Sequence, residues 1–244
     1  MELGEYDSAI KCFDKAIELN KKEDIVFINK GLALSDVNDE THLNLSEIKS
    51  IKNIDPTKRE KYENAVKCFD KAIELNSENS LTFYFKGIIL LKLRKYEDAI
   101  KCFDKTIELN PNYDPALINK GFALSIIGED EEAIECFDKS MQINPKIKTI
   151  HNNEQELIYK GVSLDNLGKY DEAIQNYDEA LKINRRNYGT WNNKGYSLFL
   201  AGKNEDAIKC FDKALKLNPN YDLALINKRH ALIDLDKYGK ATDI

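Results

Sequence analysis

The side chains of this sequence that could bind a metal or act as nucleophiles are five cysteines and three histidines. A zinc site needs such ligands a few residues apart, and a catalytic cysteine needs a histidine as its base. The closest cysteines, such as Cys68 and Cys102, are 34 residues apart, and His42, His151 and His230 are scattered. No phosphate-binding glycine loop, nucleophile elbow or paired-carboxylate motif occurs. The sequence therefore predicts no enzyme, no catalytic residue, no metal site and no cofactor.

The cysteines instead belong to a repeated phrase. Cys12 lies in KCFDKAIELN at 11–20, which returns almost unchanged at 67–76, 101–110 and 209–218, with looser copies at 135–144 and 175–184. The alanine before the phrase recurs at positions 65, 99, 133, 173, 207 and 241, in steps of 34, 34, 40, 34 and 34 residues. Equivalent cysteines of stacked units should lie about 10 Å apart, too far for a disulfide, so we expect packed thiols in a reducing compartment.

Each unit is predicted to be a pair of helices. Leu117, Gly121 and Leu124 have the three-to-four-residue spacing of a helical stripe, and the phrase that follows has the same period. Asn110–Pro111 ends one helix, because the residue before proline leaves the α region, and Asp114–Pro115 opens the next. The small residues of the repeat, such as Gly121 and Ala133, are expected where two helices cross closely. The repeated Asp and Glu residues are predicted to be solvated helix faces.

The pattern resembles the tetratricopeptide repeat (TPR) family. The resemblance covers nearly the whole chain and rests on the period and on these marked positions: Trp191, Gly121, Leu124, Tyr170, Ala173, Tyr177, Ala180 and Pro145. It implies an all-α fold, an α-solenoid in which antiparallel hairpins stack into a right-handed superhelix. It also implies a protein–protein interaction scaffold, although the family binds many unrelated partners.

The repeat boundaries predict a single TPR solenoid over residues 1–244. Residues 1–22 form an orphan second helix, 23–76 a repeat with an insertion near 38–60, and 77–110 and 111–144 regular repeats. Residues 145–184 form a repeat with six extra residues, 185–218 a regular repeat, and 219–244 an incomplete one. The 38–60 insertion is interpreted as an extra helix in preference to a surface loop. The incomplete ends suggest either a piece of a longer array or an end covered by another copy.

The composition limits the classes of partner. The formal net charge is −6, whereas nucleic-acid binders usually carry a basic excess, so neither nucleic acid nor an RNA-reading helical repeat is favoured. No apolar run reaches the roughly 18 residues of a membrane span. The first residues lack the basic start and apolar segment of a signal peptide. A cytoplasmic protein with a protein or peptide partner, and no membrane contact, is the expectation.

The resemblance places the partner on the inward side of the first helices, which is apolar and aromatic in this chain. The expected groove comprises Ile28, Leu32, Tyr84, Ile88, Leu91, Ile118, Asn119, Phe122, Ile126, Ile158, Val162, Asn192, Asn193, Tyr196 and Phe199. Contiguous exposed apolar surface usually marks a binding site. The alternative is that superhelical curvature or self-association covers some of these residues.

The expected occupant is an amphipathic helix or an apolar extended segment. In chaperone-binding members of the family, an asparagine equivalent to Asn119 and Asn193 holds peptide backbone. The rest of that clamp is missing, because Ile118 and Phe122 stand where its lysine and second asparagine would be. The second hypothesis for function is self-assembly, in which copies stack through uncapped solenoid ends.

Overall fold

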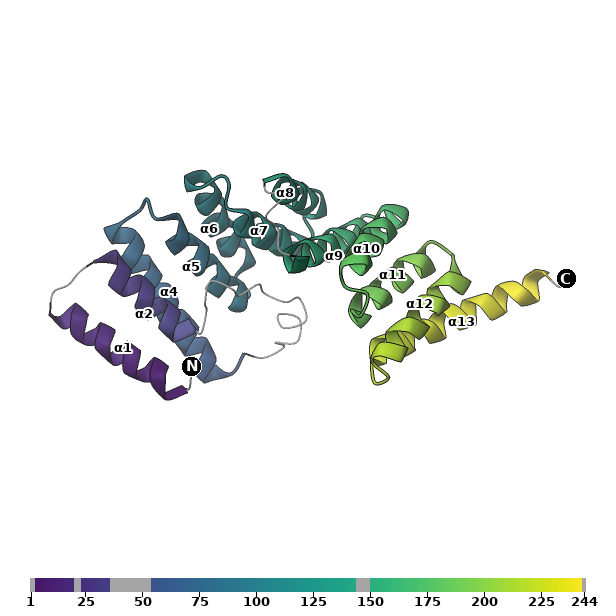
Figure 1. Cartoon of the computed structure of the whole chain (residues 1–244), viewed down its shortest axis with the longest axis horizontal. Helices are drawn as coiled ribbons and strands as arrows, with labels where there is room; N and C mark the ends of the chain where they lie inside the picture. Colours follow the sequence, from purple (N-terminus) through teal and green to yellow (C-terminus); the bar gives the residue numbers. More distant parts are fainter. Residues whose placement is uncertain (1–2, 20–22, 36–53, 144–149, 243–244) are drawn as a thin grey trace. The chain divides into compact units, whose positions relative to one another are not determined.

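The computed structural model describes residues 3–19, 23–35, 54–143 and 150–242, and within these ranges it contains helices and no strand (Figure 1). The helices fall into two compact units, residues 1–127 and 128–244. Unit 1 contains α1 (Leu3–Glu18), α2 (Asp24–Ser35), α4 (Pro56–Leu75), α5 (Ser80–Lys92), α6 (Tyr96–Leu109) and α7 (Asp114–Ile127). Unit 2 contains α8 (Asp130–Ile143), α9 (Ile150–Asn166), α10 (Tyr170–Ile183), α11 (Tyr188–Leu200), α12 (Asn204–Leu217) and α13 (Asp222–Thr242).

Within each unit, successive helices pack as hairpins, and each hairpin stacks on the next. The pairs α5–α6, α9–α10 and α11–α12 are such hairpins, and α6–α7, α10–α11 and α12–α13 are the contacts between neighbouring repeats. The described part of the chain is therefore an all-α array of the solenoid type. The unit boundary falls between the two helices of the predicted repeat 111–144.

In four hairpins a glycine of the first helix packs directly against an aromatic ring of the second helix. A Cβ atom added to Gly87 would lie 2.6 Å from Phe103 Cε1, and one added to Gly195 would lie 2.6 Å from Phe211 Cε1. Both rings are fully buried. Any larger residue at the glycine would therefore push the two helices apart. Gly121 and Ala133 are likewise buried, each within its own unit.

The turn inside a hairpin is a left-handed helix end. Gly202 has φ +74°, and the next amide, Lys203 N–H, donates to Leu198 O at 2.8 Å. This six-to-one bond is the Schellman arrangement, which favours glycine because its φ is positive. In α13 the position equivalent to Gly202 is Asp236, and the helix runs through it without a turn to Thr242.

The insertion after α2 does not interrupt the hairpin geometry. Although residues 36–53 lie outside the described part, α2 packs against α4, and a Cβ on Gly31 would lie 2.8 Å from Phe69 Cζ. Asp55 caps α4, since its carboxylate accepts from the Thr57 and Lys58 amides at 2.9 and 3.2 Å. Pro56 then supplies the first helical residue. The predicted extra helix at 38–60 thus falls mostly outside the described residues, and 56–60 begin α4.

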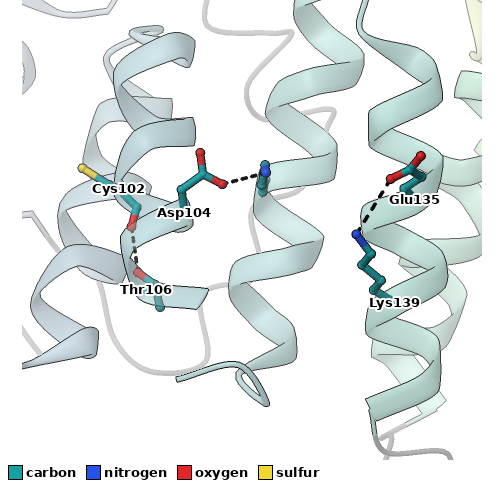
Figure 2. A network of polar contacts seen from close by, with 6 residues as sticks. Cys102, Asp104, Thr106, Glu135 and Lys139 are labelled. Carbon is teal, nitrogen blue, oxygen red and sulfur yellow. Dashed lines mark hydrogen bonds and ion pairs between the residues drawn. The ribbon is translucent and has the colours of Figure 1, made fainter. Parts of the chain in front are cut away.

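A lysine–aspartate pair joins each second helix to the first helix of the next repeat. Figure 2 shows Asp104 extending from α6 toward the neighbouring helix, where it meets Lys120 at 2.6 Å. The lysine precedes the repeat glycine and the aspartate follows the repeat aromatic, so both motifs of the sequence supply one partner. The equivalent pairs are Lys30–Asp14, Lys86–Asp70, Lys160–Asp138, Lys194–Asp178 and Lys228–Asp212. These aspartates are ion-paired between repeats, rather than simply solvated as the sequence had suggested.

Candidate partner-binding surface

Most of the expected groove residues lie in the interior of the array. Those that are buried are Ile28, Tyr84, Ile88, Leu91, Ile118, Asn119, Phe122, Ile158 and Asn192. Leu32, Ile126, Val162, Asn193 and Phe199 are half-buried, and Tyr196 is exposed. Tyr84 illustrates the reason, because its ring packs at 4.9 Å from Tyr113 and 6.1 Å from Phe103. Apolar residues at these positions fill the space between stacked repeats, so the sequence pattern alone does not separate groove from core.

The repeated asparagines bond to neighbouring helices. Asn119 Nδ2 donates to Pro115 O at 2.8 Å and to the Tyr84 hydroxyl at 3.3 Å. Three repeats further along, Asn227 Nδ2 donates to Asn192 Oδ1 at 3.0 Å, and both side chains are buried. The two hydrogens of the Asn119 amide are thus used within unit 1. The Asn119 and Asn227 side chains tie successive first helices together.

Accessible apolar side chains at inward positions gather on α11 and α13, which contact one another in unit 2. Tyr196 is 42% exposed, Ile226 51% and Ile233 42%. Phe199 is half-buried, and its ring lies 6.4 Å from that of Tyr196. We call Tyr196, Phe199, Ile226 and Ile233 the α11–α13 patch. Ile233 was not in the expected groove, although its repeat position matches that of Phe199 and could have indicated it.

Sequence profiles agree with this architecture. Three profiles, each described as tetratricopeptide repeat, match the chain: one at 80–113, 155–187 and 189–221, a second at 102–135, and a third at 1–23 and 58–79. The chain belongs to the tetratricopeptide-repeat family. TPR arrays are scaffolds for protein–protein interaction, and this coarse role follows for the present chain. Among curated protein sequences, none matches it.

Solved TPR structures share the fold. YrrB, described as a TPR protein with an unusual peptide-binding site, is 22% identical, with a TM-score of 0.66 over 89% of this chain and 97% of its own. MamA is 20% identical, with a TM-score of 0.60 over 73% and 97%. MamA from Desulfovibrio magneticus RS-1 is 19% identical, with a TM-score of 0.61 over 72% and 94%. At these identities the likeness concerns the fold alone.

One TPR repeat contains a largely buried polar cluster. Tyr177 stands where the other hairpins carry phenylalanine, and its hydroxyl donates to Asp165 Oδ2 at 2.9 Å. Ser197 Oγ donates to the same oxygen at 2.8 Å. Burial raises the pKa of Asp165 to about 6, although both hydrogen bonds lower it, and burial raises the pKa of Tyr177 well above its usual value. The cluster ties α9, α10 and α11 together.

The TPR cysteines follow the prediction of packed thiols where the structure describes them. Cys102, Cys136 and Cys210 are buried, Cys68 is half-buried and Cys12 is exposed, and all five are free. Burial raises the pKa of the Cys102 thiol to about 11, and it also raises that of Cys68 and Cys210. Among the described residues no group of three or more metal-ligating side chains occurs. In the same part of the chain, no helix is long and apolar enough to cross a membrane.

A charged hollow beside α10 was not expected from the sequence. It has a volume of about 730 Å³ and is lined by Asp178, Lys182, Arg185 and Trp191, among others. The Trp191 indole donates to Arg185 O at 3.0 Å, and Lys213 Nζ lies 4.3 Å from the ring centroid. Its charged lining differs from the apolar groove that the resemblance implied.

Proposed function

We propose that this TPR protein binds a peptide or amphipathic helix of a partner protein through an apolar, aromatic surface centred on the α11–α13 patch. The observation that carries the proposal is the exposure of Tyr196, Ile226 and Ile233 at inward positions of first helices in contact. Large apolar side chains gathered on a free surface are unfavourable in water and usually mark an interaction site. The half-buried Val162 of α9 extends the same set of positions.

The chemistry of the patch favours an apolar ligand. Tyr196 and Phe199 supply two aromatic rings, which give large contact area with little loss of side-chain entropy. The inward positions of α11 and α13 also include His230, which is exposed. The net charge of −6 supports a protein over a nucleic acid as partner. An amphipathic helix laid on the first helices satisfies both features.

Peptides selected against the wild-type chain from a phage-displayed library test the proposal. The Kd of a selected peptide is measured by fluorescence anisotropy for the wild type, for Tyr196→Ala and for Leu217→Ala. Leu217 is the matched control, because it is 38% exposed but lies on the second helix α12. Truncating a central aromatic side chain should weaken binding about tenfold or more. The control should bind as the wild type does, and circular dichroism should show equal helix content.

Equal affinity of the wild type and Tyr196→Ala for every selected peptide would remove the α11–α13 patch as the site. Self-assembly through the ends is the second candidate, and sedimentation velocity over a range of concentrations tests it. Assembly would appear as a sedimentation coefficient that rises with concentration, and a constant monomeric value would exclude it for this chain.

A further inference from the structure

A second exposed face of α13 lies where a hairpin would normally place its second helix. In α11 that face is formed by Trp191, Gly195 and Leu198, which meet Phe211 and the rest of the α11–α12 core. The residues 34 positions later in α13 are Leu225, Arg229 and Leu232. Leu225 is 48% exposed and Leu232 46% exposed, whereas Leu198 is 7% exposed.

Arginine at position 229 is incompatible with the usual partner helix. The equivalent residue is glycine in the five other first helices, and at Gly31, Gly87, Gly161 and Gly195 a single added Cβ would come within 2.6 to 2.8 Å of the facing aromatic ring. An arginine would place a Cβ and a longer stem in the same space. A second helix that carried an aromatic residue at the facing position could therefore not approach α13 at the regular distance.

The same face nevertheless favours a partner helix of a different kind. Two leucines that are nearly half exposed flank the Arg229 side chain, which is itself exposed. Covering the two leucines would be favourable because it buries apolar surface. It would also remove water from the Arg229 guanidinium, and that desolvation is unfavourable unless a carboxylate pairs with the guanidinium. Arginine and carboxylate form two parallel hydrogen bonds, so the match is geometric as well as electrostatic.

We propose that the Leu225–Arg229–Leu232 face binds an amphipathic helix that presents an acidic residue, flanked by apolar ones, where the repeat itself has an aromatic residue. The face thus accepts an acidic helix and rejects the chain's own type of second helix. Rejection of the common alternative and attraction of the correct partner both contribute to specificity. This face is distinct from the α11–α13 patch, so the inference does not rest on the function proposed above.

Two labelled peptides based on α12 test this face directly. The aromatic peptide has the 14-residue sequence of Asn204–Leu217 with Cys210→Ser, and the acidic peptide has Phe211→Glu in addition. Binding of each to the full chain is measured by fluorescence anisotropy at low and high salt. The wild type should bind the acidic peptide at least about tenfold more tightly, and high salt should reduce that preference.

Substitutions of Arg229 separate size from charge. Arg229→Gly restores the space for a ring and should reverse the preference, so that the aromatic peptide binds more tightly. Arg229→Ala removes the charge but keeps the Cβ, so the acidic peptide should lose its advantage and the aromatic peptide should gain none. Tyr196→Ala should leave the binding of both peptides unchanged. Circular dichroism of each variant checks that the array stays folded.

Four results would overturn the proposal. The wild type could bind neither peptide, which would mean that this face of α13 does not bind a helix of either kind. It could bind both peptides equally, or Arg229→Gly could leave the preference unaltered, and either result would remove Arg229 as the selector. Concentration-dependent dimerisation abolished by Arg229→Glu would identify a second copy, and not an acidic helix, as the occupant.

Discussion

The stability of unit 2 should depend on the protonation of Asp165. This half-buried carboxylate has a pKa of about 6, against 3.8 for the free side chain, because burial disfavours its charge. Between those two pH values the folded state keeps a proton that the unfolded state loses. The stabilising contribution of Asp165 is therefore complete below about pH 3.8 and is lost as the pH rises through about 6.

The size of this effect follows from the interval between the two pKa values. Each tenfold change in proton affinity corresponds to about 1.4 kcal/mol, so the upper limit is about 3 kcal/mol. Asp165 as a residue is only half-buried, so solvent screening reduces this limit and we expect about 1 to 2 kcal/mol. Asp165→Asn keeps the shape of the side chain and can still accept from Tyr177 and Ser197, but it does not titrate.

Urea unfolding from about pH 4 to pH 7.5 measures the effect, with fluorescence of the single tryptophan as the probe. That residue, Trp191, lies in α11 beside the α10–α12 packing, so it reports on unit 2. The difference in unfolding free energy between Asp165→Asn and wild type should shift by about 1 to 2 kcal/mol in favour of the variant as the pH rises. A difference that stays constant over this range would refute the reasoning, because the many other carboxylates titrate equally in both proteins.

Three further outcomes follow from the packing of the repeats. Gly195→Ala should lower the unfolding free energy by about 1 to 3 kcal/mol, because the added Cβ clashes with the facing ring. Gly189→Ala should change it by less than about 1 kcal/mol, because the Cβ meets only a side-chain oxygen at 3.2 Å. Urea titrations of the two variants compare these effects. Lys194→Met removes one inter-repeat ion pair whose aspartate is 45% exposed, so the loss of folding stability should stay below about 1 kcal/mol and shrink in high salt. Thermal unfolding followed by circular dichroism measures this loss. A large loss that does not depend on salt would contradict the expectation. In the folded chain at about pH 8, iodoacetamide should modify the exposed Cys12 first. Cys102 should react about a hundredfold more slowly than an unperturbed thiol, because burial raises the pKa of Cys102 to about 11. Mass spectrometry of timed samples measures both rates, and equal rates for Cys12 and Cys102 would contradict the prediction.

Much of the local structure could be predicted because the repeat encodes it several times. The period of 34 residues, the helical spacing of the apolar residues and the proline stops locate the hairpins without any tertiary information. The described helices begin and end close to these signals, as at Asn110 after α6 and Asp55 before α4. Helix ends are local events, since capping and turn residues act within a few positions.

The accessibility of the candidate site residues could not be predicted from their spacing, because accessibility is not a local property. Tyr84 and Ile226 occupy the same inward repeat position, yet one is 4% and the other 51% exposed. The difference arises from the rings and helices that pack against Tyr84, which no spacing rule specifies. Likewise, sequence reasoning assigned the Asn119 amide to a partner, whereas its hydrogens bond to Pro115 O of its own helix and to the Tyr84 hydroxyl of the neighbouring first helix.

The sequence by itself determined the repeat, the helical hairpins and the absence of any recognisable catalytic motif, because these depend on residue type and spacing along one chain. Only the tertiary structure decided which apolar residues are core and which are free, how Lys120 and Asp104 join neighbouring repeats, and that α2 completes its hairpin with α4 across the insertion. Those features depend on which helices approach one another. That approach is set by contacts between residues distant in sequence, such as Gly31 with Phe69.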